Sequence, residues 1–213
     1  MSISRHFVLA AGGTGGHMIP AHAVAQELMA RGHHVALVTD ERGAKIPGIF
    51  EAAQVHVLPA GRMTKSPLSW PGALRSILAG RAMARRLHET FKPTAVVGFG
   101  GYPAMPALLA AMADGIPTAI HEQNAVLGRV NRFAARRVAA IATAYPDVAR
   151  LDPRYADKLS AIANGPTLGR ALSTISQYTS AAAGASPTRA TAPASVNSVA
   201  GAAERAAQAL LRR

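Results

Sequence analysis

The sequence predicts an α/β fold, a doubly wound, Rossmann-like parallel sheet with helices on both of its faces. Two observations predict it. Through the first 145 residues, short runs rich in β-branched residues alternate with longer runs rich in Ala, Leu and Met, which is the pattern of strands joined by crossover helices. The runs 7–10 and 95–97 are apolar throughout, as expected of strands that helices cover on both sides.

The expected elements follow this alternation in chain order. The β-rich runs predict strands at residues 6–10, 35–39, 55–58, 95–98, 118–121 and 138–142. The runs of good helix formers between them predict helices at residues 18–31, 71–91, 104–114 and 128–136. We expect this domain to occupy residues 1–165, which is long enough for one ample hydrophobic core.

A different composition follows this domain. Between residues 173 and 203, 20 of the 31 residues are Ala, Ser or Thr, and only Arg189 is charged. Because no apolar periodicity persists, residues 166–213 are predicted to form a degenerate, disordered or weakly helical tail. A short terminal helix is possible over residues 202–213, and no second α/β domain is expected.

Composition and charge limit the classes of function. The chain has 213 residues, of which 49% are hydrophobic, and this excludes wholesale disorder. Its 23 Lys and Arg residues against 11 Asp and Glu give a formal charge of +12, which predicts a phosphate-bearing ligand, an anionic membrane surface or nucleic acid as partner. The absence of cysteine excludes a disulfide framework, a thiolate nucleophile and a Cys-ligated metal. The first apolar run is too short for a signal peptide or a membrane span, so we expect a cytoplasmic protein.

A glycine-rich loop, AGGTGGH at residues 11–17, lies between the first expected strand and the first expected helix. Glycines let the backbone turn tightly and approach a ligand, and the free amides of a helix start favour phosphate oxygens. The alternative is a turn that only packs tightly. His17 at the helix start would act as a general base or contact phosphate, or would only hydrogen-bond the backbone.

Two further segments follow later strands. The loop GFGGY at residues 98–102 could hold a diphosphate, or could be another sharp strand-to-helix turn. The polar run HEQN at residues 121–124 ends the next strand, where open α/β sheets bind ligands. Since both glycine loops follow buried strands of one sheet, we expect them to line one cleft.

The segment 61–92 is both basic and apolar. It contains seven Lys and Arg residues and one acid, Glu89, with Met, Leu, Ile and Trp residues between them. Such a surface suits an anionic bilayer; the alternative is a solvated basic helix face whose leucines face the core. Nucleic acid is not favoured, because aromatic residues make up only 5% of the chain and no nucleic-acid module is present.

These segments carry a family resemblance. GGTGGHMIPAHAVAQELMARGHHV, followed by VVGFGGYPAMPALLAAMADGIPTAIHEQNAVLGRVNRFAA, resembles the amino-terminal domain of the MurG family of N-acetylglucosaminyltransferases, from about residue 5 to residue 150. The resemblance implies one half of a two-domain GT-B fold. It also implies inverting transfer of N-acetylglucosamine from UDP-N-acetylglucosamine to the 4-hydroxyl of lipid I, giving lipid II for peptidoglycan, with no required metal or cofactor. The expected location is the cytoplasmic side of the inner membrane, as a peripheral protein on its anionic surface.

The resemblance also implies roles for individual residues. His17 becomes the candidate general base, and Glu122 would help to position the acceptor; these two carry the expected catalytic roles. The expected substrate-binding residues are the donor or diphosphate contacts Thr14, Gly15 and Gly16, the acceptor-diphosphate loop Gly100, Gly101 and Tyr102, and Asn124, which would reach the donor sugar or nucleotide.

One departure from the family pattern leaves alternatives open. Where the family has a Gly-Asn-Pro-Val-Arg linker and then a donor-binding domain, this chain has ANGPTLGR at residues 163–170 and then the Ala/Ser/Thr tail. We therefore expect weak binding of UDP-N-acetylglucosamine and impaired transfer by this chain alone. A non-catalytic acceptor- or membrane-binding fragment is the main alternative, and an unrelated nucleotide-binding α/β protein is a third.

Overall fold

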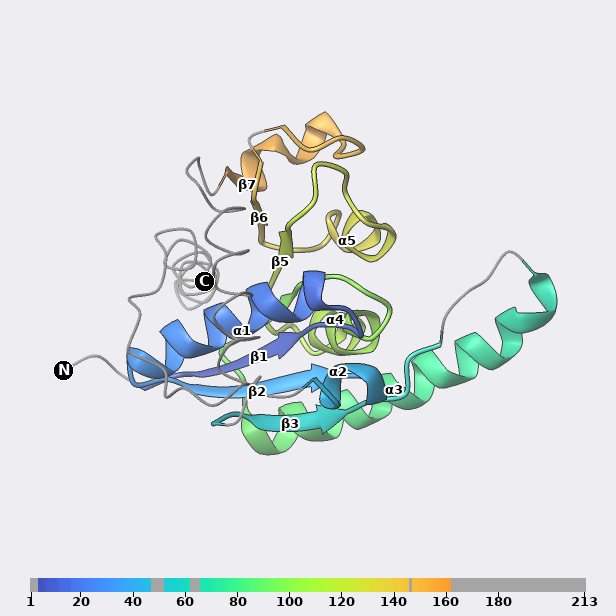
Figure 1. The fold of residues 1–213 in the computed structure, drawn as a ribbon. Helices are drawn as coiled ribbons and strands as arrows, with labels where there is room; N and C mark the ends of the chain where they lie inside the picture. The colour runs from blue at the N-terminus through green and yellow to red at the C-terminus, as the bar shows by residue number, and fades with distance from the viewer. Residues whose placement is uncertain (1–3, 47–51, 62–65, 146, 162–213) are drawn as a thin grey trace, which may run out of the picture.

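The computed structural model describes residues 4–46, 52–61, 66–145 and 147–161. Seven strands form one sheet in the order β3-β2-β1-β4-β5-β6-β7, and each adjacent pair is parallel. Helices lie on both faces of this sheet (Figure 1), so the predicted doubly wound, Rossmann-like α/β fold is confirmed. The strands are β1 (His6–Ala10), β2 (His34–Thr39), β3 (Gln54–Val57), β4 (Ala95–Gly98), β5 (Thr118–Glu122), β6 (Ala140–Thr143) and β7 (Leu159–Ala161).

The sheet separates the core into two apolar layers. One layer packs α1 against side chains such as Phe7, Leu9 and Phe99, and the other packs α3, α4 and α5 against the opposite face, with Val8 and Ile120 at its centre. Strands β1 and β4 are buried on both faces, as their apolar runs predicted. The helices are α1 (Gly15–Ala30), α2 (Glu41–Ala44), α3 (Trp70–Phe91), α4 (Ala104–Ala113) and α5 (Arg129–Ala134), with 3₁₀ turns at Pro67–Ser69 and Pro153–Lys158.

Several predicted boundaries were wrong. Helix α1 begins at Gly15, three residues before the predicted start, because the Thr14 carbonyl accepts hydrogen bonds from the amides of His17 and Met18, both at 3.0 Å. Strand β6 begins at residue 140 rather than 138, and α5 is shorter than predicted. Neither α2 nor β7 was predicted. The linker segment 163–170 and the tail predicted for residues 166–213 lie outside the described residues.

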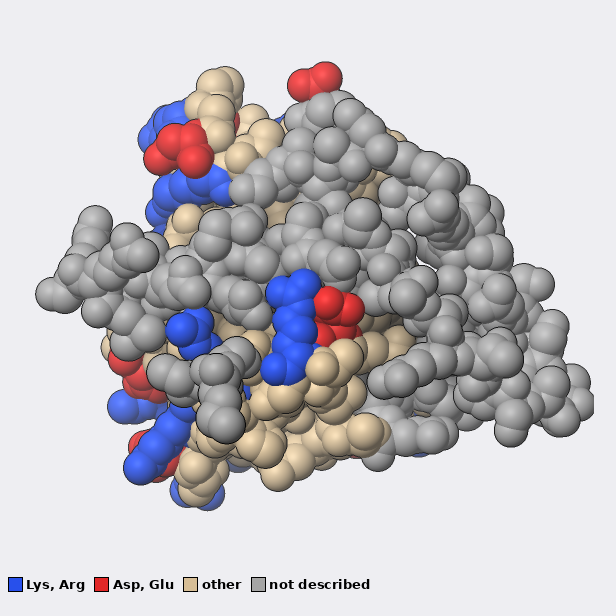
Figure 2. All heavy atoms as spheres, turned by 90° about the vertical axis from the view of Figure 1, so that its left-hand side faces the viewer, with Lys and Arg blue, Asp and Glu red and all other residues tan. Residues whose placement is uncertain are grey.

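Charged side chains alternate in sign over part of the surface. Figure 2 shows the side facing left in Figure 1, where the amino ends of the strands lie, and in the part of this face that described residues form, basic side chains stand beside acidic ones. Within the described part of the chain, no helix has the length and apolar character needed to cross a bilayer.

Candidate substrate-binding site

The two glycine loops lie side by side at the carboxyl edge of the sheet. Strands β1 and β4 are neighbours, and the helices that follow them pack on opposite faces. The loops contact each other, since a Cβ added at Gly12 would overlap the ring of Pro103. This point, where the strand order reverses, is where open α/β sheets bind ligands.

His17, the last residue of the first glycine loop, lies against the second loop. Gly100 and Gly101 have φ values of +91° and +77°, a conformation that L side chains rarely adopt. A Cβ at Gly100 would lie 3.1 Å from His17 Cε1, and one at Gly101 would lie 3.3 Å from His17 Cδ2. The second loop therefore needs glycine at both positions to accommodate the imidazole supplied by the first. Tyr102 follows them, partly buried, and its carbonyl accepts a hydrogen bond from Met105 at the start of α4.

The start of α1 is open to solvent. Thr14, Gly15 and Gly16 are exposed, Thr14 makes no side-chain cap to the helix, and the first turn contains no acidic residue. The first amides of a helix have no partner within the helix, and the helix dipole favours an anion there. Thr14, Gly15 and Gly16, the expected donor or diphosphate contacts, therefore lie at a helix start whose own first turn carries no carboxylate.

Glu122 is a buried carboxylate at the end of β5, only 1% exposed. Its Oε1 accepts hydrogen bonds from the backbone amide and side-chain amide of Asn124, at 3.1 and 2.8 Å. Its Oε2 accepts from the Gly128 amide at 2.8 Å and from Asn131 Nδ2 at 3.0 Å. This carboxylate therefore holds the loop 123–128 in shape and leaves Asn124 exposed at the edge.

Asn131 connects this loop to the second glycine loop. It is 1% exposed in α5, and its Nδ2 also donates to the His121 carbonyl at 2.9 Å. A Cβ at Gly100 would lie 3.5 Å from the same nitrogen. The sequence analysis assigned Asn131 no role. A polar residue on the buried face of a helix was the signal that could have identified it, because such groups need hydrogen-bond partners.

His121 is an uncharged group beside the site at neutral pH. Its side chain is 7% exposed, and burial lowers the pKa of this imidazole from 6.5 to about 4, with a smaller contribution from the nearby charge of His17. No cluster of three or more metal-ligating side chains occurs among the described residues. The site thus contains glycine backbone, the uncharged His121 ring, side-chain amides and one carboxylate with four hydrogen-bond donors.

This depressed pKa predicts acid sensitivity of the fold. Between about pH 4 and pH 6.5 the unfolded chain binds a proton at His121 that the folded chain does not, so stability rises with pH across this window. The expected loss on acidification is about 3 kcal/mol at most. Urea unfolding at pH 7 and pH 4.5 should show a smaller difference for His121→Gln than for the wild type. His34→Gln, at an exposed histidine, should leave the difference unchanged, and equal pH dependence in all three proteins would contradict the assignment.

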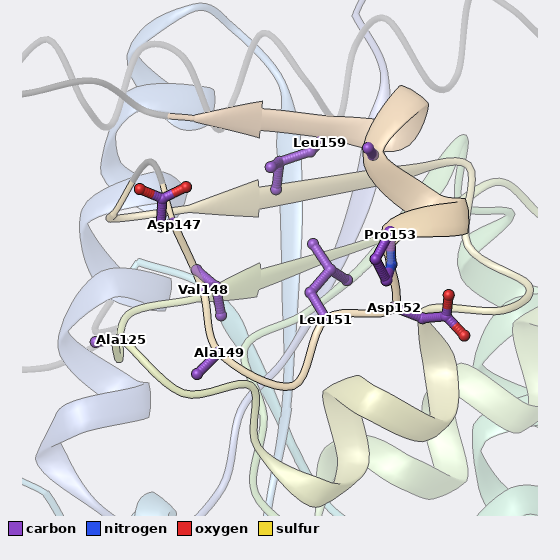
Figure 3. Close-up of a pocket in the computed structure, with 9 residues that line it drawn as sticks. Ala125, Asp147, Val148, Ala149, Leu151, Asp152, Pro153 and Leu159 are labelled. Carbon is purple, nitrogen blue, oxygen red and sulfur yellow. The ribbon is translucent and has the colours of Figure 1, made fainter.

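A separate open pocket of about 420 Å³ lies beside β6 and β7 and contains none of the predicted site residues. Figure 3 shows that its two carboxylates, Asp147 and Asp152, stand at opposite ends of a mainly apolar lining. Because these are its charged groups, a diphosphate would be repelled there.

The comparisons with known proteins identify the family of this domain. Residues 7–143 match the glycosyltransferase family 28 N-terminal domain. The UDP-N-acetylglucosamine--N-acetylmuramyl-(pentapeptide) pyrophosphoryl-undecaprenol N-acetylglucosamine transferases of Erythrobacter litoralis and Novosphingobium aromaticivorans are 64% and 66% identical over 161 and 163 residues, in each case 76% of this chain. The chain spans 40% and 42% of the length of these relatives.

A solved structure adds the fold-level comparison. The crystal structure of MurG from Acinetobacter baumannii matches 75% of this chain and 45% of its own chain, with a TM-score of 0.61 and 31% sequence identity. The matched family model covers more than half of the chain, from β1 to the end of β6. The chain therefore belongs to glycosyltransferase family 28, in which it corresponds to the N-terminal domain of MurG-type N-acetylglucosamine transferases.

Proposed function

We propose that these residues form the acceptor-binding part of an enzyme that transfers N-acetylglucosamine from UDP-N-acetylglucosamine to the 4-hydroxyl of lipid I, giving lipid II. The observation that carries this proposal is the close packing of Gly100 and Gly101, in the second glycine loop, against His17 of the first. The names of the 64% and 66% identical relatives supply the donor and acceptor classes.

The diphosphate of the lipid-linked acceptor would bind at the glycine loops. The exposed start of α1 offers amides at Gly15 and Gly16. In the second loop, Gly100 and Gly101 have positive φ values and no side chains that would occupy the space of a ligand. Backbone amides and a helix dipole suit a dianionic group without any metal. No cofactor is part of this proposal.

His17 would serve as the general base. The acceptor 4-hydroxyl oxygen attacks C1 of the donor sugar, the bond from C1 to the UDP oxygen breaks, and the hydroxyl proton passes to the imidazole, with inversion at C1. Glu122 is too buried to touch either substrate. It would act as a positioning residue, by holding Asn124 where that side chain reaches the donor.

The main alternative is a non-catalytic fragment that binds acceptor or membrane. The match covers only 40% and 42% of the length of the named relatives, and the family resemblance assigns most donor contacts to their carboxy-terminal domain. We expect the 213-residue chain alone to bind UDP-N-acetylglucosamine weakly and to show no appreciable transfer, because nothing then orients the leaving UDP.

A complementation assay distinguishes the acceptor-binding part of an enzyme from a non-catalytic fragment. Turnover of a lipid I analogue is measured with the chain alone and with a separately produced donor domain of a relative. If the chain is the acceptor-binding part of an enzyme, turnover should occur only in the mixture. His17→Ala should then remove this turnover while acceptor affinity changes little, because a general base serves the chemical step. Acceptor binding with no turnover in any mixture would favour the non-catalytic alternative, and robust turnover by the chain alone would show that no second domain is needed.

We also propose that the first half of α3 contacts an anionic membrane. The apolar membrane stripe, defined as Leu68, Trp70, Leu74 and Leu78, is between 47% and 92% exposed, so these leucines do not face the core. Arg75 is exposed in the same half of the helix, and Arg86 is exposed in the second half. This end of α3 extends beyond the carboxyl ends of the strands (Figure 1), the side on which the glycine loops lie. Arg62, Met63 and Lys65 of the basic segment lie outside the described residues.

This surface predicts salt-sensitive binding to anionic liposomes. Each Lys or Arg near such a surface contributes about 1 kcal/mol, screened by salt, and burying a leucine contributes about 1.5–3 kcal/mol. In co-sedimentation with phosphatidylglycerol vesicles, Leu74→Ser combined with Leu78→Ser should therefore weaken binding at least tenfold. Val55→Ser, at a valine 43% exposed on the edge strand β3, is the matched control. Equal partition of the wild type into neutral and anionic vesicles at every salt concentration would reject the proposal.

A further inference from the structure

The His17 imidazole has one hydrogen-bond partner among the described residues, and it is Gln123. The terminal amide of Gln123 lies 2.6 Å from His17 Nδ1. The two residues are 106 positions apart, and they meet because β1 and β5 end at the same edge of the parallel sheet. Neighbouring Glu122 anchors the loop through Asn124 and Gly128, so the Gln123 side chain projects from a fixed backbone.

The orientation of this amide decides which ring nitrogen can accept a proton. If the amide nitrogen faces Nδ1, Nδ1 must accept, the ring proton resides on Nε2, and the neutral ring has no lone pair for a substrate. If the amide oxygen faces Nδ1, Nδ1 carries the proton and the Nε2 lone pair is free. A rotation of 180° about the last side-chain bond interchanges these states with little change in shape.

The length of the contact favours the amide oxygen at Nδ1. A separation of 2.6 Å suits a contact from nitrogen to oxygen better than one between two nitrogens, because oxygen is the smaller atom. The other terminal atom of the amide has no hydrogen-bond partner among the described residues, so the contact with His17 is the one that distinguishes the two orientations.

We infer that Gln123 is a positioning residue for His17: its Oε1 accepts the Nδ1 proton and thereby keeps the Nε2 lone pair free. This inference rests on the proposed role of His17 as general base, and it gives that role a structural cause. The imidazole is held between the neutral amide of Gln123 and the backbone of Gly100 and Gly101. Nearby His121 can ionise, but burial keeps its ring neutral. An amide in this position fixes the tautomer without a negative charge beside the acceptor diphosphate.

The tautomer of His17 can be measured in the 213-residue chain without any substrate. Nitrogen shifts of ¹⁵N-histidine-labelled protein, recorded at a pH where the ring is neutral, distinguish a protonated ring nitrogen from an unprotonated one. The spectrum of His17→Gln assigns the His17 signals among the eight histidines. The inference predicts that wild-type His17 is mainly in the Nδ1–H form.

Two variants of Gln123 test whether this side chain determines the tautomer of His17. Gln123→Met keeps the length of the side chain but removes its acceptor, so the tautomer ratio should move toward Nε2–H by roughly fivefold or more, the size of one hydrogen bond. Gln123→Glu restores an acceptor oxygen and should restore the Nδ1–H form. Gln54→Met, at an exposed position on β3, is the matched control and should leave the ratio unchanged.

A wild-type ring in the Nε2–H form, or a ratio that Gln123→Met leaves unchanged in folded protein, would overturn the inference. Neither result depends on donor or acceptor. Failure of the chain to bind a lipid I analogue would instead count against the proposed function and would leave the measured tautomer as it is, so the two failures are distinguishable.

Discussion

Replacing Gly101 with alanine is expected to abolish binding of a lipid I analogue. The residue has φ +77°, and an added Cβ would lie 3.1 Å from Gly12 Cα and 3.3 Å from both Gly12 O and His17 Cδ2. The two glycine loops would have to move apart, so their amides would no longer converge on one diphosphate. Loss of two hydrogen bonds to a charged group, each about 1.5–3 kcal/mol, weakens binding roughly 100-fold or more.

A matched glycine separates this effect from backbone strain. Gly32 has φ +83°, is exposed in the turn between α1 and β2, and has no heavy atom within 4 Å of an added Cβ. Gly32→Ala should therefore incur a similar conformational cost, about 1–2 kcal/mol, and retain acceptor affinity. If Gly101→Ala binds the analogue as tightly as the wild type, in protein shown by circular dichroism to be folded, the glycine loops are only structural turns.

Replacing Glu122 with alanine should destabilise the fold by about 2–4 kcal/mol, a large part of the stability of a domain of this size. The change leaves four donors, two of them on Asn124 and the others on Gly128 and Asn131, without their shared acceptor. Asn131 is 1% exposed, and a buried polar group that loses its partner costs about 1–3 kcal/mol. Asn124 and Gly128 are exposed, so their donors can bind water and contribute less. Urea unfolding followed by circular dichroism measures the loss.

Glu122→Gln keeps the shape and isolates the charge. Its amide nitrogen must face two of the four donors, so we expect an intermediate loss of stability. Glu89→Gln, at an exposed acid on α3, should change the free energy of unfolding by no more than about 0.5 kcal/mol. A Glu122→Ala protein as stable as Glu89→Gln would mean that the carboxylate does not organise loop 123–128.

The parts of the fold predicted from sequence are those with strong local patterns. Strands β1 and β4 are continuous apolar runs buried on both faces, and the long helix α3 was predicted to within one residue of its observed start at Trp70. Helix α2 and strand β7 have four and three residues, too few for periodicity to be detected. The start of α1 was predicted too late because Gly15 and Gly16 are poor helix formers, although the Thr14 carbonyl includes them in the first turn.

The candidate site was predictable as a set of loops and not as a set of contacts. Chain position placed the segments around Gly12, Gly100 and Glu122 after three strands, and in a parallel sheet those ends share an edge. Local sequence patterns do not show where a side chain points or which distant residue it meets, and His17 and Gln123 are 106 positions apart. The contact of Gln123 with His17 and the links made by Asn131 therefore appear only in the folded chain.

Equilibrium binding of a soluble lipid I analogue to the wild-type 213-residue chain tests the central claim most directly. The proposed acceptor site predicts saturable binding of one analogue per chain and competition by inorganic diphosphate, since the amides at the glycine loops recognise the acceptor diphosphate. Absence of saturable binding to folded protein, or binding that diphosphate does not displace, would contradict the assignment of the two glycine loops as the acceptor site.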